Sequence, residues 1–491
     1  MLPRLTLPRS RSSFLAACSL ITPPFISEVQ EGSVMKKAAV VCFVVLLLGA
    51  TVAVNAGQQS VADSAGASDW PHWRGPDGTG VARGGTLPTT WDGSENIAWK
   101  AELRGLGVSS PIVVSDRVFV TYQIGRGVRQ RGMHPTLARG PGADEGIEQP
   151  LGGSRVDAAD PEVTFAVAAF DRADGTLLWE YEFAAEGPRH PVHDKHNLAS
   201  PSPVSDGERV YAWFGTGQIV ALDMNGELLW QRHLGEEYSP FDLQWGHASS
   251  PTLYGDSLIL QCDHPRESYL LWLDKRTGAE QRKLDRGSGM HSHSTPVVVP
   301  GPRGDELIVN SSARLESFDP RTGELLWHAG EPNQFPIAVP TYADGILYTS
   351  RGYRAGPYMA IRLGGEGDVT DTEVLWRVPT GAPYVASILY FDGLIYMANG
   401  NGIATVVDPA TGERLWQERI GGVYTATPVA GDGKIYLFSE TGEAVVLEAG
   451  RSPRVISRNP LNERVIASPA IAGGRIFVRT DRHLVAIGSR D

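Results

Sequence analysis

The chain has 491 residues and a formal net charge of −12, with 56 Gly, 34 Pro and 12 Trp. An acidic chain without a long basic run is unsuited to nucleic acid, because phosphate contacts need concentrated Lys and Arg. Dispersed Gly and recurring Trp favour many short strands joined by tight turns. One repeat fold can occupy the whole length, so the length alone does not require several domains.

Residues 1–56 predict an export signal that follows an over-extended start. Met35 to Lys37 form a short positive region, Ala38 to Val54 are apolar, and Asn55-Ala56 completes a small-residue cleavage site. We expect translation to start at Met35, cleavage to follow Ala56, and the mature chain to be periplasmic or extracellular without a membrane span. An uncleaved membrane anchor is the alternative, since the apolar stretch is near the lower limit of spanning length.

After an N-terminal segment, residues 57–95, the chain contains a repeat of roughly forty residues. Its first phrase is a small polar residue and proline that open a strand, and its second is an Asp turn with Gly followed by Trp. The openers are Ser110-Pro111, Ser202-Pro203, Ser250-Pro251, Thr295-Pro296, Thr427-Pro428 and Ser468-Pro469, with looser versions at Val339-Pro340 and Ser387-Ile388. The second phrases are Asp171–Trp179, Asp223–Trp230, Asp319–Trp327 and Asp408–Trp416.

Two features interrupt the regular spacing. Residues 122–162 lengthen the first repeat, are rich in Gly, Arg and Pro, and predict a surface insertion. The strand Asn96–Trp99 has no repeat of its own, whereas the last repeat ends at His483–Ile487 without a Trp strand. Pairing of these two segments would complete the last blade and remove the open sheet edges.

The predicted fold is therefore all-β. Residues 96–488 should form an eight-bladed β-propeller of four-stranded antiparallel blades, closed by the N-terminal strand. A single blade cannot bury both of its faces, so the repeats must stack in a ring. The Trp after each Asp turn is a large flat ring at a fixed offset, well placed to pack between neighbouring blades.

The repeats resemble those of the quinoprotein alcohol-dehydrogenase-like superfamily, the PQQ-type propellers. The family's motif A-x-D-x-x-T-G-x-x-x-W matches Ala169–Trp179, and Asp319–Trp327 and Asp408–Trp416 match it from the Asp onward. The segment Trp70–Pro76 is also similar to the start of exported bacterial PQQ-like propeller proteins. The resemblance implies the propeller fold over nearly all of residues 96–488.

The resemblance does not by itself imply a cofactor. The PQQ-dependent dehydrogenases carry two adjacent cysteines over the cofactor, and the quinohaemoproteins add a C-x-x-C-H haem motif. This chain has only Cys18, Cys42 and Cys262, none adjacent and none in such a motif. We expect no bound cofactor, with PQQ or a divalent metal in the channel as the alternative.

Polar and aromatic residues gather in the segments that lead into the inner strands. Such segments border the central channel of a propeller, where polar groups beside aromatic surface are typical of small-ligand pockets. His190 and His193 lie in the first of these segments, and His247 and His291 are expected to face the channel. The candidate ligand-binding residues are His196, Asn197, Asp242, Trp245, His247, His291, His293, Tyr384 and Tyr424. A water-bridged polar channel lining is the alternative.

Cys262, the one cysteine after the leader, lies two residues before His264 on a predicted strand. Alternation would place both on one face, as a Cys-His nucleophile requires, but no third orienting group is evident. A structural thiol is the favoured interpretation.

These patterns favour an exported binding or scaffold module without PQQ catalysis. The functional analogy is the propeller lipoprotein of the outer-membrane β-barrel assembly machinery, although this chain lacks that protein's lipid-bearing cysteine. The alternative is a PQQ- or metal-dependent oxidoreductase with its site in the channel. The partner would be an unknown protein or a small-molecule ligand.

Overall fold

The computed structural model describes residues 69–93, 95–125, 127–130, 156–160, 162–188, 192–193, 195–351 and 356–489. These residues belong to one compact unit, residues 59–491. The predicted leader, its cleavage site, His190 and the middle of the predicted insertion lie outside the described residues. Within the described part of the chain, no helix is both long and apolar enough to cross a membrane.

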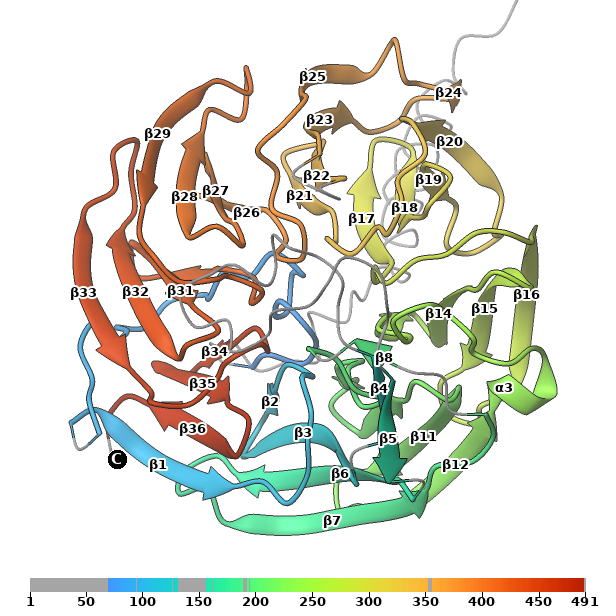
Figure 1. The fold of residues 1–491 in the computed structure, drawn as a ribbon. Helices are drawn as coiled ribbons and strands as arrows, with labels where there is room; N and C mark the ends of the chain where they lie inside the picture. The colour runs from blue at the N-terminus through green and yellow to red at the C-terminus, as the bar shows by residue number, and fades with distance from the viewer. Residues whose placement is uncertain are drawn as a thin grey trace, which may run out of the picture. The chain divides into compact units, whose positions relative to one another are not determined.

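Eight four-stranded antiparallel blades form a closed ring, as predicted (Figure 1). Blade one consists of β2 (Ile112–Val114), β3 (Arg117–Ile124), β6 (Thr164–Asp171) and β7 (Leu177–Ala184), and blade two of β9 (Val204–Ser205), β10 (Arg209–Trp213), β11 (Gln218–Asp223) and β12 (Leu228–His233). Blade three consists of β13 (Thr252–Tyr254), β14 (Ser257–Asp263), β15 (Ser268–Asp274) and β16 (Glu280–Gly287). Blade four consists of β17 (Val297–Gly301), β18 (Gly304–Asn310), β19 (Leu315–Phe318) and β20 (Leu325–Ala329).

Blades five to eight continue around the ring. Blade five consists of β21 (Thr341–Ala343), β22 (Ile346–Ser350), β23 (Tyr358–Arg362) and β25 (Val374–Val378), and blade six of β26 (Leu389–Phe391), β27 (Leu394–Ala398), β28 (Ile403–Val407) and β29 (Arg414–Arg419). Blade seven consists of β30 (Val429–Gly431), β31 (Lys434–Phe438), β32 (Glu443–Glu448) and β33 (Val455–Pro460). Blade eight consists of β34 (Ala470–Ala472), β35 (Arg475–Arg479), β36 (His483–Ile487) and β1 (Ile97–Glu102). The first of the described strands, β1, is thus the outermost strand of the last blade.

Closure follows the predicted pairing. Trp99 lies opposite Ala486 and Glu102 opposite His483 in the antiparallel β1–β36 ladder. The Trp99 ring then crosses to the first blade, where its Nε1 donates to the carbonyl of Arg172 at 3.0 Å. The closing strand therefore joins blade eight to blade one by both backbone and side chain.

The same docking of Trp on a turn recurs between other blades. Trp230 of blade two donates its Nε1–H to the carbonyl of Lys275 in blade three at 3.1 Å. Gly278 closes that turn with φ +72°, and a Cβ there would lie 2.7 Å from the Trp230 ring. Only Gly satisfies both the left-handed backbone and this close approach. The Asp274 carboxylate fixes the turn by accepting from the backbone of Arg276 and Thr277.

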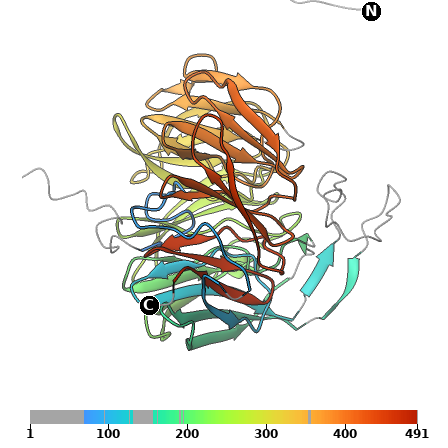
Figure 2. The same ribbon diagram turned by 90° about the vertical axis from the view of Figure 1, so that its left-hand side faces the viewer.

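Three additions lie outside the repeat. The short strand β24 (Gly367–Asp368) pairs in parallel with β20, and the one-turn helix α3 (Leu234–Glu237) follows β12. Between β3 and β6 the chain leaves blade one as β4 (Gly127–Gln130) and returns as β5 (Val156–Asp160). These two strands form a small sheet with β8 (Val192–His193) that projects from the ring (Figure 2).

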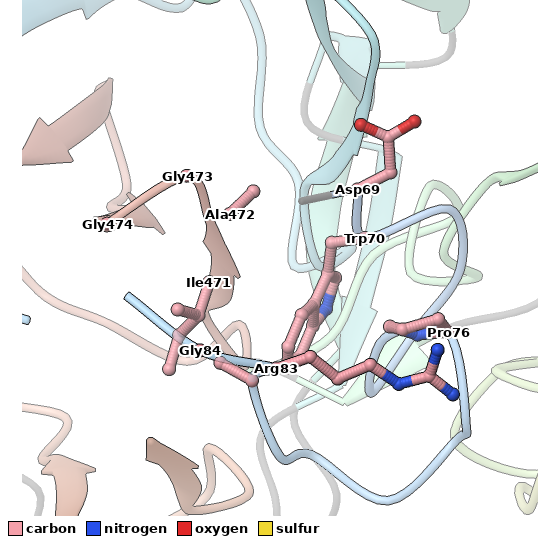
Figure 3. Close-up of a pocket in the computed structure, with 10 residues that line it drawn as sticks. Asp69, Trp70, Pro76, Arg83, Gly84, Ile471, Ala472, Gly473 and Gly474 are labelled. Carbon is pink, nitrogen blue, oxygen red and sulfur yellow. The ribbon is translucent and has the colours of Figure 1, made fainter. Parts of the chain in front are cut away.

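The N-terminal segment packs against the innermost strands at one end of the channel. Trp70 pairs with Val113 of β2, and Ala82 pairs with Ala430 of β30. Figure 3 shows a void between Trp70 and the β34–β35 hairpin of blade eight, with the Arg83 side chain extending away from the hairpin toward Pro76. That void measures about 20 Å³, room for roughly one water, so it is a packing defect rather than a ligand site.

Candidate functional site

A cavity of about 480 Å³ lies in the central channel. Its wall comes mainly from the segments that precede the innermost strands, as the repeat predicted. The lining residues are Trp73, Val108, Ser110, His193, Lys195, His196, Ser200, Ser202, Gln244, Trp245, Ala248, Ser250, His293, Thr295, Gln334, Phe335, Ile337, Val339, Tyr384, Val385, Ser387, Thr425, Thr427, Ile466 and Ser468. Volumes of this size suit small organic ligands.

The opener residues form two series of hydrogen bonds between neighbouring blades around this cavity. The backbone N–H of Ser110 donates to the hydroxyl of Ser202 in the next blade at 2.9 Å. The same bond joins Ser202 to Ser250, Ser250 to Thr295, Val339 to Ser387, Ser387 to Thr427, and Thr427 to Ser468. The small polar residue of the repeat therefore joins neighbouring blades, and Val339 is the member without a hydroxyl. This role explains the recurrence of Ser and Thr at that position.

The N-terminal segment contributes Trp73 to the lining of the cavity. The neighbouring Arg74 is 2% exposed, and its Nη2 donates to the Thr79 carbonyl, the Thr341 hydroxyl and the Ile388 carbonyl, each at 2.9 Å. Burial lowers the pKa of Arg74 to about 9. This guanidinium ties the segment to blades five and six and holds Trp73 in place.

Two imidazoles, those of His196 and His293, approach Gly246 in the wall. Nδ1 of His293 lies 3.0 Å from the Gly246 carbonyl, and a Cβ on Gly246 would lie 3.3 Å from Nε2 of His196. Burial, with repulsion from His193, lowers the pKa of His196 to about 4. Burial, with repulsion from His196, lowers the pKa of His293 to about 3. Both rings are therefore neutral near pH 7. Nδ1 of His293 donates to the Gly246 carbonyl and Nδ1 of His196 accepts from the Asn197 N–H, which leaves Nε2 as an acceptor on His293 and as a donor on His196.

The aromatic wall is held in an unfavourable backbone conformation. Trp245 and Phe335 have φ values of +74° and +85°, a region that bulky residues rarely adopt. The Trp245 ring meets His193 edge-on at 5.4 Å, and the Phe335 ring lies 5.5 Å from His291. Backbone strain of this kind is concentrated at binding and catalytic sites, where the surrounding structure maintains it.

Lys195 is the one charged residue among the described residues that line the cavity. Its Nζ lies 2.7 and 3.0 Å from the two carboxylate oxygens of Glu440 in blade seven. The cation is thus already neutralised, so the cavity offers no unpaired charge to a strongly anionic ligand.

Four of the nine candidate residues line the cavity together: His196, Trp245, His293 and Tyr384. The other five lie elsewhere. Asn197 and Tyr424 are 2% and 3% exposed, and the Asn197 Oδ1 accepts from the Ala199 N–H. Asp242 pairs with Arg266 at 2.5 Å. The ligand-binding role of all nine stays a prediction.

His247 and His291 are not among the residues that line this cavity. The His247 ring is enclosed by Trp213 and Phe241, at 4.2 and 5.1 Å, and approaches His264 of the same blade. The backbone N–H of His291 donates to the Ser312 hydroxyl, and its ring packs on Phe335. His247 therefore belongs to the packing of blades two and three.

Several lining residues were not among the candidates, notably Trp73, Lys195, Gln244, Gln334 and Phe335. Phe335 and Gln334 lie in the segment before β21, in the same place in the repeat as the histidines, and this spacing was the available signal. Trp73 carries no signal in the repeat pattern, because it reaches the channel from outside the repeat. Cys262 is fully buried, and burial raises its thiol pKa, as expected of a structural cysteine.

The fold and channel define a quinoprotein-like, eight-bladed propeller. A family described as "Outer membrane protein assembly factor BamB" matches residues 164–334, 319–449 and 400–491, which together cover more than half of the chain. The chain belongs to this family.

The chain is also similar to three known proteins. A tetrathionate hydrolase of Acidithiobacillus ferrooxidans is 26% identical over 267 residues, 50% of this chain and 48% of that protein. The chain thus spans about half the length of this curated relative. The quinohemoprotein alcohol dehydrogenase of Comamonas testosteroni has a similar fold, with a TM-score of 0.55, 13% identity and coverage of 87% and 82% of the two chains. A europium-containing methanol dehydrogenase has a TM-score of 0.57, 12% identity and coverage of 84% and 90%.

The residues of this cavity do not fit PQQ with its metal ion. That cofactor is a multiply charged anion held with a hard cation, which needs carboxylate ligands. Among the described lining residues there is no carboxylate, and the single cation, Lys195, is paired with Glu440. The wall suits a ligand with little charge.

Proposed function

We propose that this protein is an exported binding module that holds a small, flat, weakly charged molecule in the channel cavity. The aromatic rings of Trp73, Trp245, Phe335 and Tyr384 would pack against its faces. Neutral His196 and His293, with the opener hydroxyls, would hydrogen-bond its polar edge. Such a mixture of aromatic surface and few polar groups is typical of small-molecule sites.

The observation that carries this proposal is the left-handed backbone of Trp245 and Phe335. A non-Gly residue in that region costs of order 1 kcal/mol or more. Most other non-Gly residues with positive φ in the described chain are Asp, Asn or Ser, which suit turns, whereas these two are bulky and face the cavity. Keeping large rings there at a cost in stability favours a role in binding.

The proposal is tested with tryptophan fluorescence, because Trp73 and Trp245 line the cavity. The mature chain is titrated with neutral bicyclic aromatics such as 1-naphthol, with tetrathionate, and with PQQ with and without Ca²⁺. We expect saturable quenching by one neutral aromatic molecule per chain. Phe335→Asn, which tolerates the left-handed backbone but lacks the ring, should weaken binding at least tenfold without lowering the melting temperature.

The matched control is Phe391→Asn, the same substitution in blade six, at a half-buried residue that does not line the cavity. It should leave the affinity unchanged, even where it lowers stability. Failure of every aromatic to bind saturably, or equal weakening by both variants, would contradict the proposal.

The alternative is an oxidoreductase or a hydrolase in the same channel. Its support is similarity: the propeller fold of the two dehydrogenases and the 26% identity to the tetrathionate hydrolase. Ca²⁺-dependent binding of PQQ together with dye-linked alcohol oxidation, or turnover of tetrathionate, would establish it in place of the binding module.

A protein-binding role is a second candidate, favoured by apolar residues on the rim. Leu177 and Leu178 of β7 and Leu228 and Leu229 of β12 are 40–47% exposed on neighbouring outer strands. Scaffold propellers can bind partners through such apolar surface. A role of this kind would be lost in Leu178→Lys and Leu229→Lys while binding in the cavity is retained.

A further inference from the structure

Three potential metal ligands meet on the rim between blades one and two, at the outer strands of these blades. None of the three lines the channel cavity. They are Glu186, which follows β7, His233 at the end of β12, and Glu236 in α3. One ligand atom from each lies within 4.8 Å of the others, and Nε2 of His233 is 3.9 Å from Oε1 of Glu236. Among the described residues this is the one place where three such side chains come so close.

The His233 imidazole occupies a slot between two glycines. A Cβ on Gly187, which has φ +76°, would lie 3.2 Å from Nε2, and a Cβ on Gly235 would lie 3.2 Å from Cε1. The side chain is 12% exposed, and neither ring nitrogen has a hydrogen-bond partner in the described chain. Leaving a buried polar group unsatisfied is costly, and a metal ion at this point would supply a partner for one of the two nitrogens.

Gln218 holds the two blades in register at this point. It lies directly opposite His233 in the β11–β12 ladder. Its Nε2 donates to the Ala184 carbonyl at 3.0 Å, and its Oε1 accepts from the Glu186 N–H at 2.8 Å. The backbone of Glu186 is therefore fixed beside His233 before any ligand binds, which lowers the cost of assembling a site.

We propose that Glu186, His233 and Glu236 bind a divalent transition-metal ion that joins blade one to blade two. One imidazole and two carboxylates match the preferences of Zn²⁺ better than those of Ca²⁺, which takes oxygen ligands. Zn–N and Zn–O bonds of about 2.0–2.2 Å place tetrahedral ligands about 3.4 Å apart. The two exposed glutamates can close the remaining distance by rotamer changes, and water would complete the coordination.

The test is calorimetric titration of the metal-free mature chain with Zn²⁺ in a buffer that does not chelate it. We expect one Zn²⁺ per chain and a higher melting temperature that EDTA reverses. His233→Ala and Glu236→Gln should each weaken binding at least tenfold. Glu236→Gln is an isosteric change at an exposed residue, so it keeps the test valid if His233→Ala lowers stability.

Two histidine variants serve as controls. His328 is another half-buried rim histidine beside a carboxylate, with its Nδ1 3.9 Å from Oδ1 of Asp368. The His328→Ala variant should bind Zn²⁺ normally. His293→Ala removes an imidazole of the channel and should also bind normally. Absence of saturable binding, equal binding by His233→Ala and the unchanged chain, or loss of binding in His293→Ala alone would each overturn the proposal.

Discussion

Several buried histidines of this molecule have lowered pKa values and stay neutral at mild acid pH. Burial lowers the pKa of His264 to about 4, and it lowers the pKa of His247 well below its ordinary value of 6.5. His196 and His293, at about 4 and about 3, belong to the same region. These rings stay neutral in the folded chain at pH values where the unfolded chain already binds protons.

Stability should therefore fall as the pH drops below 6.5. Between pH 6.5 and the folded pKa, each such histidine costs about 1.4 kcal/mol per pH unit, because only the unfolded state is protonated. From pH 7 to pH 5 this amounts to about 2 kcal/mol per histidine. His293→Gln should reduce the difference in unfolding free energy between the two pH values by about that amount, as measured by urea unfolding. An undiminished difference would show that His293 titrates normally in the folded chain.

At the scale of elements, docking of Trp on a Gly turn connects successive blades. Where a blade lacks the Trp or the turn, other residues make the contacts. Blade five lacks the Asp-Gly turn, and Trp327 of blade four instead donates to the buried Glu306 of its own blade at 2.6 Å. Blade three lacks a Trp on its outer strand. There Arg282 lies opposite Trp272, and a Cβ on Gly323 of the next blade would lie 3.2 Å from the Arg282 side chain. Arg282 of blade three thus approaches the Gly turn of blade four, as a Trp does at other blade interfaces.

The loss of stability caused by disturbing the Trp–Gly contact can be separated from the loss caused by left-handed backbone strain, by comparing two Gly→Ala variants. Gly278 and Gly433 have φ values of +72° and +68°, but a Cβ on Gly278 would meet Trp230 at 2.7 Å, whereas a Cβ on Gly433 would meet nothing within 4 Å. Both Ala variants incur about 1 kcal/mol of left-handed strain. Gly278→Ala should lose a further 1–3 kcal/mol, as overpacking does. Chemical unfolding of the two variants measures the difference, and equal losses would mean that the Trp230 ring moves aside freely.

At the scale of the whole molecule, closure depends on one strand from the far end of the chain. Besides its ladder with β36, β1 contributes Lys100, whose Nζ lies 2.8 Å from Oε1 of Glu463. Although burial opposes it, hydrogen bonds from His483, Lys100 and Thr480 lower the pKa of Glu463 to about 2. The closing strand is thus held by backbone, aromatic and ionic contacts.

Trp99→Ala and Trp376→Ala test whether closure differs from an ordinary blade interface. Both remove a Trp that stacks on a Gly and donates to a carbonyl of the next blade, at 3.0 and 2.8 Å. Each should cost about 3–5 kcal/mol, as for a large core truncation. In hydrogen exchange, Trp99→Ala should speed exchange in β1 and β36, because a frayed closing strand exposes edge backbone, whereas Trp376→Ala should not. Unchanged exchange of β1 in Trp99→Ala would contradict this role.

The sequence by itself determined the eight blades, the closing strand and the packing of Trp between blades, because these depend on spacings along the chain. It also indicated that the segments before the inner strands border the channel. Only the tertiary structure decided which of the nine candidate side chains reach the cavity. His293 lies two residues before its opener Thr295 and lines the cavity, as does Ala248 two residues before Ser250. His247 lies three residues before Ser250, and its ring packs against Trp213 and Phe241 instead.

The same holds for Trp73 and for the three ligands at the rim. Trp73 enters the channel because Arg74 is held by Thr341 and Ile388, more than 260 residues away in sequence. Glu186 meets His233 because Gln218 joins a loop of one blade to a strand of the next. Periodicity specifies which backbone positions repeat, but contacts between irregular segments depend on side-chain packing in three dimensions, which no spacing in the sequence records.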